Sequence, residues 1–379
     1  MQDIDAKTVA LAQELIRVDT VDPPGNERAA AEFVAKVLAD AGIRAELIDI
    51  GPGRANLLAR VKGSGERKSL VYSAHFDTIP ADPAEWSRSP FGGEVAEGKL
   101  HGRGATDMKA GMAAMVMAAV ALKRANAPLK GDLVLALTAA ENSNCLGAEA
   151  FVRGGRLRDA GALLISEPSS LDVFVAEKGA LWLRATATGD YGHNAFSESR
   201  TGDRGNAILR MAEFLSRVRD LEIEAPPHRH LGPPTINVGL IDGGVSRPII
   251  AHRCTADIDV RTVPGLKPAA VLAQFRGIAG RHVTVEQTGF KPPVDTPDDD
   301  PFVKLCLDVT GEVRGRSVRP AGVGYYSDGT VLAPALGIPL VIIGPGETGM
   351  SGAVDEHCDL GKLALASRIY EKIAHRALS

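Results

Sequence analysis

Residues 69–80 read SLVYSAHFDTIP, and this stretch does most to decide the class of fold. Mostly apolar side chains fill residues 69–74, which predicts a buried strand. His75 and Asp77 follow two residues apart, and therefore on one side of an extended chain. A histidine backed by a carboxylate is typical of a metal site, where the acid fixes the imidazole tautomer. A core histidine bonded to a turn aspartate explains this motif equally well, so both interpretations stay open at this point.

Helical and strand patterns alternate on both sides of this stretch. Helices are predicted at 29–42 and 108–125, and further buried strands at 131–141 and 162–168. Helices between short apolar strands indicate an α/β sheet with several parallel strands. In such a sheet, we expect functional side chains at the carboxyl ends of the strands.

The middle of the chain has a different pattern. Residues 179–196 and 253–265 alternate with period two, which is typical of an antiparallel sheet with one covered face. A helix is predicted between them at 205–221, and the helix–strand rhythm returns after about residue 289. We therefore expect an α/β domain formed by both chain ends and an inserted α+β domain, with the bounds 1–176 plus 289–379 and 177–288.

Composition restricts the kind of protein further. The chain has 379 residues, enough for two domains with substantial cores. Its formal net charge of −4 argues against general nucleic-acid binding, because no basic excess neutralises phosphates. The start predicts an amphipathic helix and not a signal peptide, and we expect no apolar run to reach the roughly 20 residues of a membrane span. Four widely spaced cysteines without a CxxC pair favour free thiols and a cytoplasmic protein.

Three acids, like His75, lie at or near the ends of predicted strands and helices. Asp107 lies in the glycine-rich segment HGRGATDMKAG before a predicted helix, where a capping aspartate is also common. Glu141 and Glu167 each end a predicted strand. One histidine and two carboxylates can hold zinc, and a further free carboxylate can act as the base that activates water. The set therefore indicates a metal site at the strand ends.

The motifs of the chain, taken in order, resemble those of the acetylornithine deacetylase / succinyl-diaminopimelate desuccinylase family of dinuclear zinc aminoacylases and carboxypeptidases. The resemblance covers nearly the whole chain. It implies a mixed-sheet catalytic α/β domain of the zinc-peptidase type. It also implies an inserted ferredoxin-like α+β domain that forms a lid and usually mediates dimerisation. The segments that carry it include SAHFDTIP, GRGATDMKAGMAAMV, SEPSS, EKGALWLRATATG, TINVG, DVRTVPG, LGIPLVIIGPG and VDE.

The resemblance assigns roles to the residues at the strand ends. His75 and Glu167 match ligands of a first metal, and Asp107 matches the aspartate that bridges two metals. Asp77 matches the acid behind the histidine. Glu141 matches the general base, the first acid of a Glu-Glu pair.

Further roles fall in the inserted domain. His193 matches a histidine that reaches across the dimer to polarise the substrate carbonyl. Arg261 matches a residue that grips the substrate carboxylate, as a guanidinium fork can. Asn237, in TINVG, is placed with Arg261 among the substrate-binding residues.

This chain departs from the family pattern at the second metal. The resemblance implies two ligands that belong to this metal alone, and their positions are occupied by Asn142 and Gly352. Asn is a poor zinc ligand beside a carboxylate, and glycine has no ligating side chain. We therefore expect one zinc per subunit, with cobalt or manganese as alternatives. Compensation by a nearby residue is the other interpretation, and the candidates are His357, Ser351 and Glu347.

Two smaller departures occur elsewhere. Pro248 and Ala251 stand where the family usually has an asparagine and a proline. Tyr325 and Tyr326 lie beside Asp328 before the last predicted helix, where a tyrosine could supply a phenol to the site or pack in the core.

The leading hypothesis is a metal-dependent hydrolase that cleaves an amide bond of a small amino-acid-like carboxylate. Glu141 would take a proton from water and return it to the leaving amine. A lyase, cyclase or isomerase on the same fold and metal is the second hypothesis, and a non-catalytic binding protein is the third. Retention of Glu141, His193 and Arg261 argues against the third. The expected partners are the substrate and a second copy of the chain, without nucleic acid or membrane.

Overall fold

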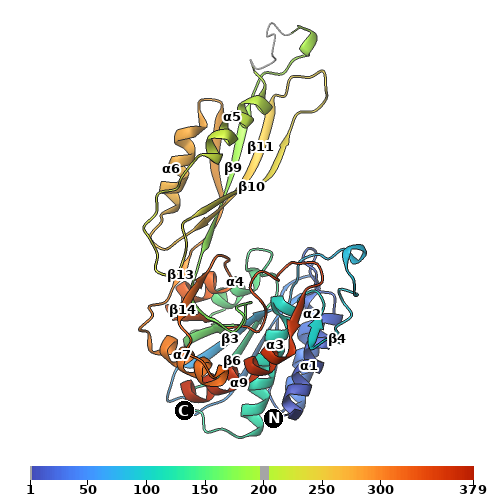
Figure 1. The fold of residues 1–379 in the computed structure, drawn as a ribbon, viewed down its shortest axis with the longest axis vertical. Coiled ribbons are helices and arrows are strands. Elements are labelled where there is room, and N and C mark those ends of the chain that lie inside the picture. Colours follow the sequence, from blue (N-terminus) through green and yellow to red (C-terminus); the bar gives the residue numbers. More distant parts are fainter. Residues whose placement is uncertain (1, 197–204) are drawn as a thin grey trace. The chain divides into compact units, whose positions relative to one another are not determined.

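The computed structural model describes residues 2–196 and 205–379, which divide into two compact units (Figure 1). Unit 1 comprises 1–176, 294–322 and 327–379, and unit 2 comprises 177–293 and 323–326. The expected boundary after 288 falls inside the strand Val283–Lys291, so the chain returns to unit 1 only at residue 294.

Unit 1 is built on one large mixed sheet with the strand order β1-β2-β6-β3-β7-β15-β8-β13, and β14 also pairs with β8. The pairs β3–β6, β3–β7 and β7–β15 are parallel, as the sequence predicted, whereas β1–β2 and β2–β6 are antiparallel. The strands are β1 Ala45–Gly51, β2 Arg54–Val61, β3 Ser69–His75, β6 Leu133–Thr138, β7 Ala160–Ile165, β8 Val173–Glu177, β13 Val294–Asp295, β14 Pro320–Val323 and β15 Leu340–Ile342.

The helices of unit 1 cover this sheet, and α3 lies at the centre of the core. Every α3 residue from Ala110 to Leu122 is buried, and α3 packs against α1, α9 and the sheet. The helices are α1 Gln2–Arg17, α2 Glu27–Asp40, α3 Ala110–Arg124, α4 Leu146–Arg153, α7 Pro301–Arg314, α8 Gly329–Leu336 and α9 Leu360–Leu378, with short turns η1 Pro83–Glu85 and η2 Ala105–Lys109.

The expectation that no apolar run has the length of a membrane span needs a correction. The helical segment Ala105–Arg124 has that length and a mean hydropathy of 1.3 in its most apolar window. Of this window, 94% is buried inside the protein, as in the core helix of a globular domain. The run is apolar because it is packed on all sides.

A small antiparallel sheet in unit 1 joins distant parts of the chain. Its strand order is β16-β5-β4, with the bounds β16 His357–Asp359, β5 Lys99–His101 and β4 Glu94–Ala96. It places the segment after residue 350 beside the glycine-rich segment that contains Asp107.

Unit 2 has the element order of a ferredoxin-like fold, β-α-β-β-α-β (Figure 1). Its antiparallel sheet has the order β10-β11-β9-β12. Buried residues alternate along β11, as the period-two pattern predicted, whereas the edge strand β10 is largely exposed. The elements are β9 Gly179–Thr188, η3 Asn194–Phe196, α5 Ala207–Arg219, β10 Thr235–Gly243, β11 Arg253–Thr262, α6 Pro268–Ala279 and β12 Val283–Lys291.

Two helical glycines provide a test of how tightly α3 packs. A Cβ atom at Gly111 would lie 1.7 Å from the Ser166 hydroxyl oxygen and 3.0 Å from the Ser166 carbonyl oxygen, whereas a Cβ at Gly277 in α6 meets nothing within 4 Å. We expect Gly111→Ala to destabilise the protein by about 1–3 kcal/mol through overpacking. Gly277→Ala should stabilise it by up to about 1 kcal/mol through helix propensity. Urea unfolding of both variants checks this, and equal shifts in one direction would contradict the packing argument.

Candidate metal centre

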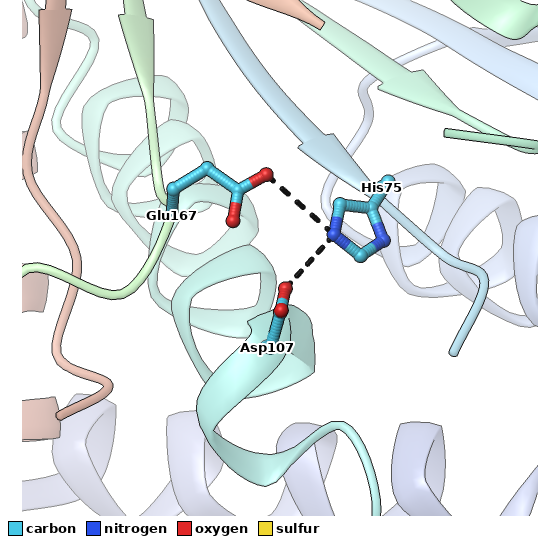
Figure 2. A group of neighbouring side chains, drawn as sticks. All are labelled: His75, Asp107 and Glu167. Carbon is cyan, nitrogen blue, oxygen red and sulfur yellow. Dashed lines mark hydrogen bonds and ion pairs between the residues drawn. The ribbon is translucent and has the colours of Figure 1, made fainter. Parts of the chain in front are cut away.

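His75, Asp107 and Glu167 converge at the carboxyl edge of the large sheet (Figure 2). His75 is the last residue of β3, and Glu167 follows the parallel neighbour β7 by two residues. Asp107 comes from the turn η2 before α3. His75 Nε2 lies 3.0 Å from Asp107 Oδ1 and 3.6 Å from Glu167 Oε1. One ligand atom of each residue lies within 4.8 Å of those of the other two.

The donor set fits a metal ion. His75 Nδ1 lies 2.8 Å from the Asp77 carbonyl oxygen, which can only accept, so Nδ1 carries the proton and Nε2 faces the two acids. Burial alone would lower the pKa of His75, but the hydrogen bond with Asp107 and the nearby negative charges raise it well above its ordinary value. Burial also raises the pKa of Glu167, and Asp107 adds to this rise. Nε2 therefore faces two carboxylate oxygens, and one nitrogen with two carboxylate oxygens suits zinc.

Asp77 is positioned differently from the expected acid behind the histidine. Its backbone carbonyl contacts the imidazole, whereas its carboxylate lies 3.8 Å from His75 Nδ1. The carboxylate accepts hydrogen bonds from the backbone of Glu141 at 3.1 Å and of Asn142 at 2.8 Å. It also accepts one from the Asn142 side-chain amide at 2.8 Å. Asp77 thus links the histidine turn to the segment that carries Glu141.

Glu141 lies in a loop and not at a strand end, because β6 stops at Thr138. The side chain is buried, with 8% of the residue exposed. Burial raises the pKa of Glu141 well above its usual range, and neighbouring carboxylates add to the rise. Ala140, Asn144 and Cys145 have φ values of 63°, 70° and 58°, which is strained for residues with a Cβ atom. A strained loop with a buried acid is typical of a functional site.

The two positions of the missing ligands have other contacts. Asn142 bonds to Asp77, as described above, and Gly352 adopts a left-handed φ of 75°. The Ser351 hydroxyl donates to Asp107 Oδ2, the oxygen that does not face His75.

The other two candidates for a replacement ligand contact residues other than Asp107. His357 Nδ1 lies 3.0 Å from the Asp355 carbonyl oxygen, and its ring packs against His101 at 5.5 Å between centroids. Glu347 accepts a hydrogen bond from Lys362 at 2.8 Å. Of the three candidates, Ser351 is the one with a contact to the Asp107 carboxylate in the described part of the chain.

Sequence reasoning missed Glu356, which fixes the turn that presents Asp107. Its Oε1 accepts the backbone N–H groups of Thr106 at 2.9 Å and Asp107 at 3.1 Å, and its Oε2 accepts from Arg103 at 2.6 Å. Burial raises the pKa of Glu356 to about 7, and the charge of Asp107 contributes. Glu356 is part of the segment VDE, but its contact with Arg103, 253 residues away, leaves no local signal in the sequence.

Asp328 is a further buried acid near the site. It accepts a hydrogen bond from the Thr138 hydroxyl at the end of β6. Burial raises the pKa of Asp328 to about 6. The sequence placed Tyr325 and Tyr326 beside it, but these two residues belong to unit 2.

The remaining predicted residues lie in unit 2 and are described there by themselves. His193 is exposed, and its Nδ1 accepts the backbone N–H of Ala195 at 3.1 Å. Arg261 Nε lies 2.9 Å from Asp259 Oδ1, and its guanidinium stacks 5.3 Å from the centre of the Tyr326 ring. Asn237 lies on the exposed strand β10 opposite Asp259. Unit 2 therefore places Arg261 and Asn237 on neighbouring strands, while His193 belongs to a different segment.

A buried histidine and a glutamate at the carboxyl ends of two parallel strands, an aspartate from η2 and a further buried glutamate after β6 are the residues of a metal-dependent α/β hydrolase. Residues 71–376 match Peptidase family M20/M25/M40, and the chain belongs to this family. It is 28% identical to a probable succinyl-diaminopimelate desuccinylase of Staphylococcus epidermidis, with 92% of each chain covered.

Solved structures agree with the fold. An M20 family metallo-carboxypeptidase of Sulfolobus solfataricus has a TM-score of 0.81 at 18% identity, with 97% of this chain and 98% of that chain covered. A protein of Bacillus subtilis, described as a dinuclear metal-binding peptidase of the M20 family, has a TM-score of 0.76 at 16% identity, with 100% and 99% covered. These comparisons confirm the family resemblance and the predicted fold class. The protein is a metal-dependent hydrolase of amide bonds, and nothing in the comparisons favours a non-hydrolytic reaction.

Proposed function

We propose that this hydrolase removes an acyl group from the nitrogen of a small amino-acid-type carboxylate, with one metal ion held by His75, Asp107 and Glu167. The observation that carries the proposal is that Asp107 and Glu167 converge on Nε2 of His75. The desuccinylase named among the relatives supports the substrate class. Zinc suits the ligands best, while cobalt and manganese remain alternatives.

A metal ion bound at these residues would act as a Lewis acid that polarises the scissile carbonyl and makes water more acidic. Glu141 takes the proton of the attacking water and later gives it to the leaving amine. Burial raises the pKa of Glu141, which makes its carboxylate a stronger base than an exposed glutamate. Arg261 binds the substrate carboxylate with Asn237 beside it, and His193 stabilises the oxyanion.

The contacts of Asp107 support a single metal. Oδ1 faces His75, and Oδ2 accepts the hydrogen bond of Ser351. At the position of the missing acidic ligand, Asn142 donates its amide to Asp77. The two positions that would hold a second metal, 142 and 352, thus have neutral residues. The hydroxyl of the neighbouring Ser351 donates to Asp107.

We also propose a cytoplasmic homodimer formed through unit 2. Strand β10 forms one edge of its sheet and exposes Leu240 and Ile241, with 68% and 58% of each residue exposed. An exposed apolar edge strand is suited to pairing with a second chain. The four cysteines are buried free thiols, which agrees with a reducing compartment.

The division of labour between metal binding and proton transfer can be tested by two substitutions. His75→Ala should abolish both metal binding and turnover, because it removes the nitrogen ligand. Glu141→Gln should keep the metal and lower kcat by about 10²–10⁴-fold, because it removes the base. Elemental analysis and assays with N-succinyl-diaminopimelate and a panel of N-acetyl amino acids give the two readouts. Loss of metal in Glu141→Gln would contradict the assignment of Glu141 as a base that is not a ligand.

The single-metal proposal predicts one tightly bound metal per chain even in excess zinc. The double substitution Asn142→Glu with Gly352→His should raise the metal content towards two, whereas either single substitution should change it little. Anomalous diffraction at the zinc edge is the decisive measurement on the native protein. Two full peaks about 3.5–4 Å apart would refute a single metal.

The dimer predicts complementation between two inactive variants. A mixture of His193→Ala and Glu141→Gln subunits should recover part of the turnover, because each mixed dimer has one site with an intact base and an intact partner histidine. Size-exclusion chromatography checks the dimer, and labelled subunits check exchange. No recovery after demonstrated exchange would show that His193 does not act across the dimer.

A further inference from the structure

A second group of buried acids lies behind the loop that carries Glu141. Asp22, Glu27 and Asp77 are buried, with 4%, 0% and 0% of each residue exposed. One oxygen of each lies within 4.8 Å of those of the other two, which by itself resembles a metal site. They come from three segments, because Asp22 precedes α2, Glu27 begins it and Asp77 follows β3.

These acids already accept hydrogen bonds from residues 140–143. Their oxygens therefore hold the loop that carries Glu141 and are not arranged for a metal ion. Glu27 accepts the backbone N–H of Ala140 at 3.2 Å. Asp77 accepts those of Glu141 and Asn142, and Asp22 accepts the hydroxyl of Ser143 at 2.6 Å. Four successive loop residues, 140–143, therefore donate to one cluster of carboxylates.

Arg54, the first residue of β2, supplies the positive charge of this cluster. Its Nε donates to Glu27 at 3.0 Å and its Nη1 to Asp22 at 3.2 Å, while Nη2 contacts both acids. The side chain is 12% exposed. Burial alone would lower the pKa of Arg54, but its bonds with Glu27 and Asp22 raise it. A lysine at this position could not bond both carboxylates in this forked geometry.

Two residues near Arg54 also support the loop and the position of the guanidinium. Asn56, two residues along β2, accepts the backbone N–H of Ala139 at 3.0 Å and donates to the Gly147 carbonyl at 2.8 Å, so it joins both ends of the loop. Gly25 has a left-handed φ of 84°, and a Cβ there would lie 2.5 Å from Arg54 Cζ. Gly25 thus leaves the space that the guanidinium fills.

We propose that Arg54 is a positioning residue for the reaction, because it holds Glu27 and Asp22 where they fix the loop that presents Glu141. The loop requires this support because it contains three residues with left-handed backbone. The catalytic consequence rests on the proposed role of Glu141 as the base.

Hydrogen exchange tests the structural half without any substrate. In Arg54→Lys, the peptide that covers 139–147 should lose protection, while the peptide that covers β7 should not change. Arg60→Lys is the matched control, because Arg60 lies on the same strand and also bonds two carboxylates, Asp159 and Asp132. Unchanged exchange at 139–147 in Arg54→Lys, or equal loss in both variants, would overturn the proposal.

Kinetics test the catalytic half with N-succinyl-diaminopimelate, or with the best substrate of the acyl amino acid panel. Arg54→Lys should lower kcat on the order of 100-fold, the effect of a reacting group displaced by about 1 Å. KM and metal content should stay unchanged, and Arg60→Lys should keep the native kcat. A purely structural role would lower the folded fraction and leave kcat per folded, metal-loaded enzyme intact, which would overturn the proposal.

A second pair of variants retains every charged and polar side chain of the cluster. Gly25→Ala should displace the guanidinium and reproduce the exchange and kcat losses. Gly53→Ala shares the left-handed backbone, with φ of 70°, but its Cβ would meet nothing closer than 3.6 Å, so it should keep the native kcat. Equal kcat values for the two variants would count against the proposal. Undiminished turnover by Glu141→Gln would refute the proposed base, and the exchange measurement would still decide whether Arg54 holds the loop.

Discussion

The structure of unit 1 depends on one constraint: each buried carboxylate needs a compensating positive charge or hydrogen bonds. Taking one ion out of water costs several kcal/mol unless charges and hydrogen bonds replace the solvent. Arg54 compensates Asp22 and Glu27, and Arg103 compensates Glu356. In residues 2–196 and 205–379, neither Asp107 nor Glu167 pairs with a lysine or arginine, and both face His75. Asp107 and Glu167 are therefore acids whose charge a bound metal ion would compensate.

The strand order explains why these acids meet. β3 lies between β6 and β7 and runs parallel to both, so the register places His75 opposite Thr138 and Ser73 opposite Ile165. The loops that follow these strands leave the same edge of the sheet, as expected for the carboxyl ends of parallel strands. The metal centre and the loop of Glu141 are thus neighbours by topology, while the antiparallel strand β2 brings Arg54 to the same end.

The sequence predicted the parts of this site that local pattern encodes. His75 and Glu167 could be placed because apolar runs stop beside them, and Asp107 because glycines precede a long apolar helix. The end of β6 was misplaced by three residues, because Ala139 and Ala140 continue the apolar run although Ala140 has left-handed backbone. Arg54 has no local signal, since its partners lie 27 and 32 residues away and an arginine at the start of a strand is unremarkable in sequence.

Asn142 and the backbone of the Glu141 loop are linked through Asp77, which accepts hydrogen bonds from both. The amide of Asn142 donates to the same carboxylate oxygen that accepts its own backbone N–H. An acidic side chain in this rotamer would bring a second carboxylate against Asp77, and Arg54 is already occupied by Asp22 and Glu27. A carboxylate at 142 therefore has to turn towards another cation, and a second metal ion would provide it. If the protein binds one metal ion, as proposed, a neutral donor at 142 is the residue type that suits Asp77 and the loop of Glu141.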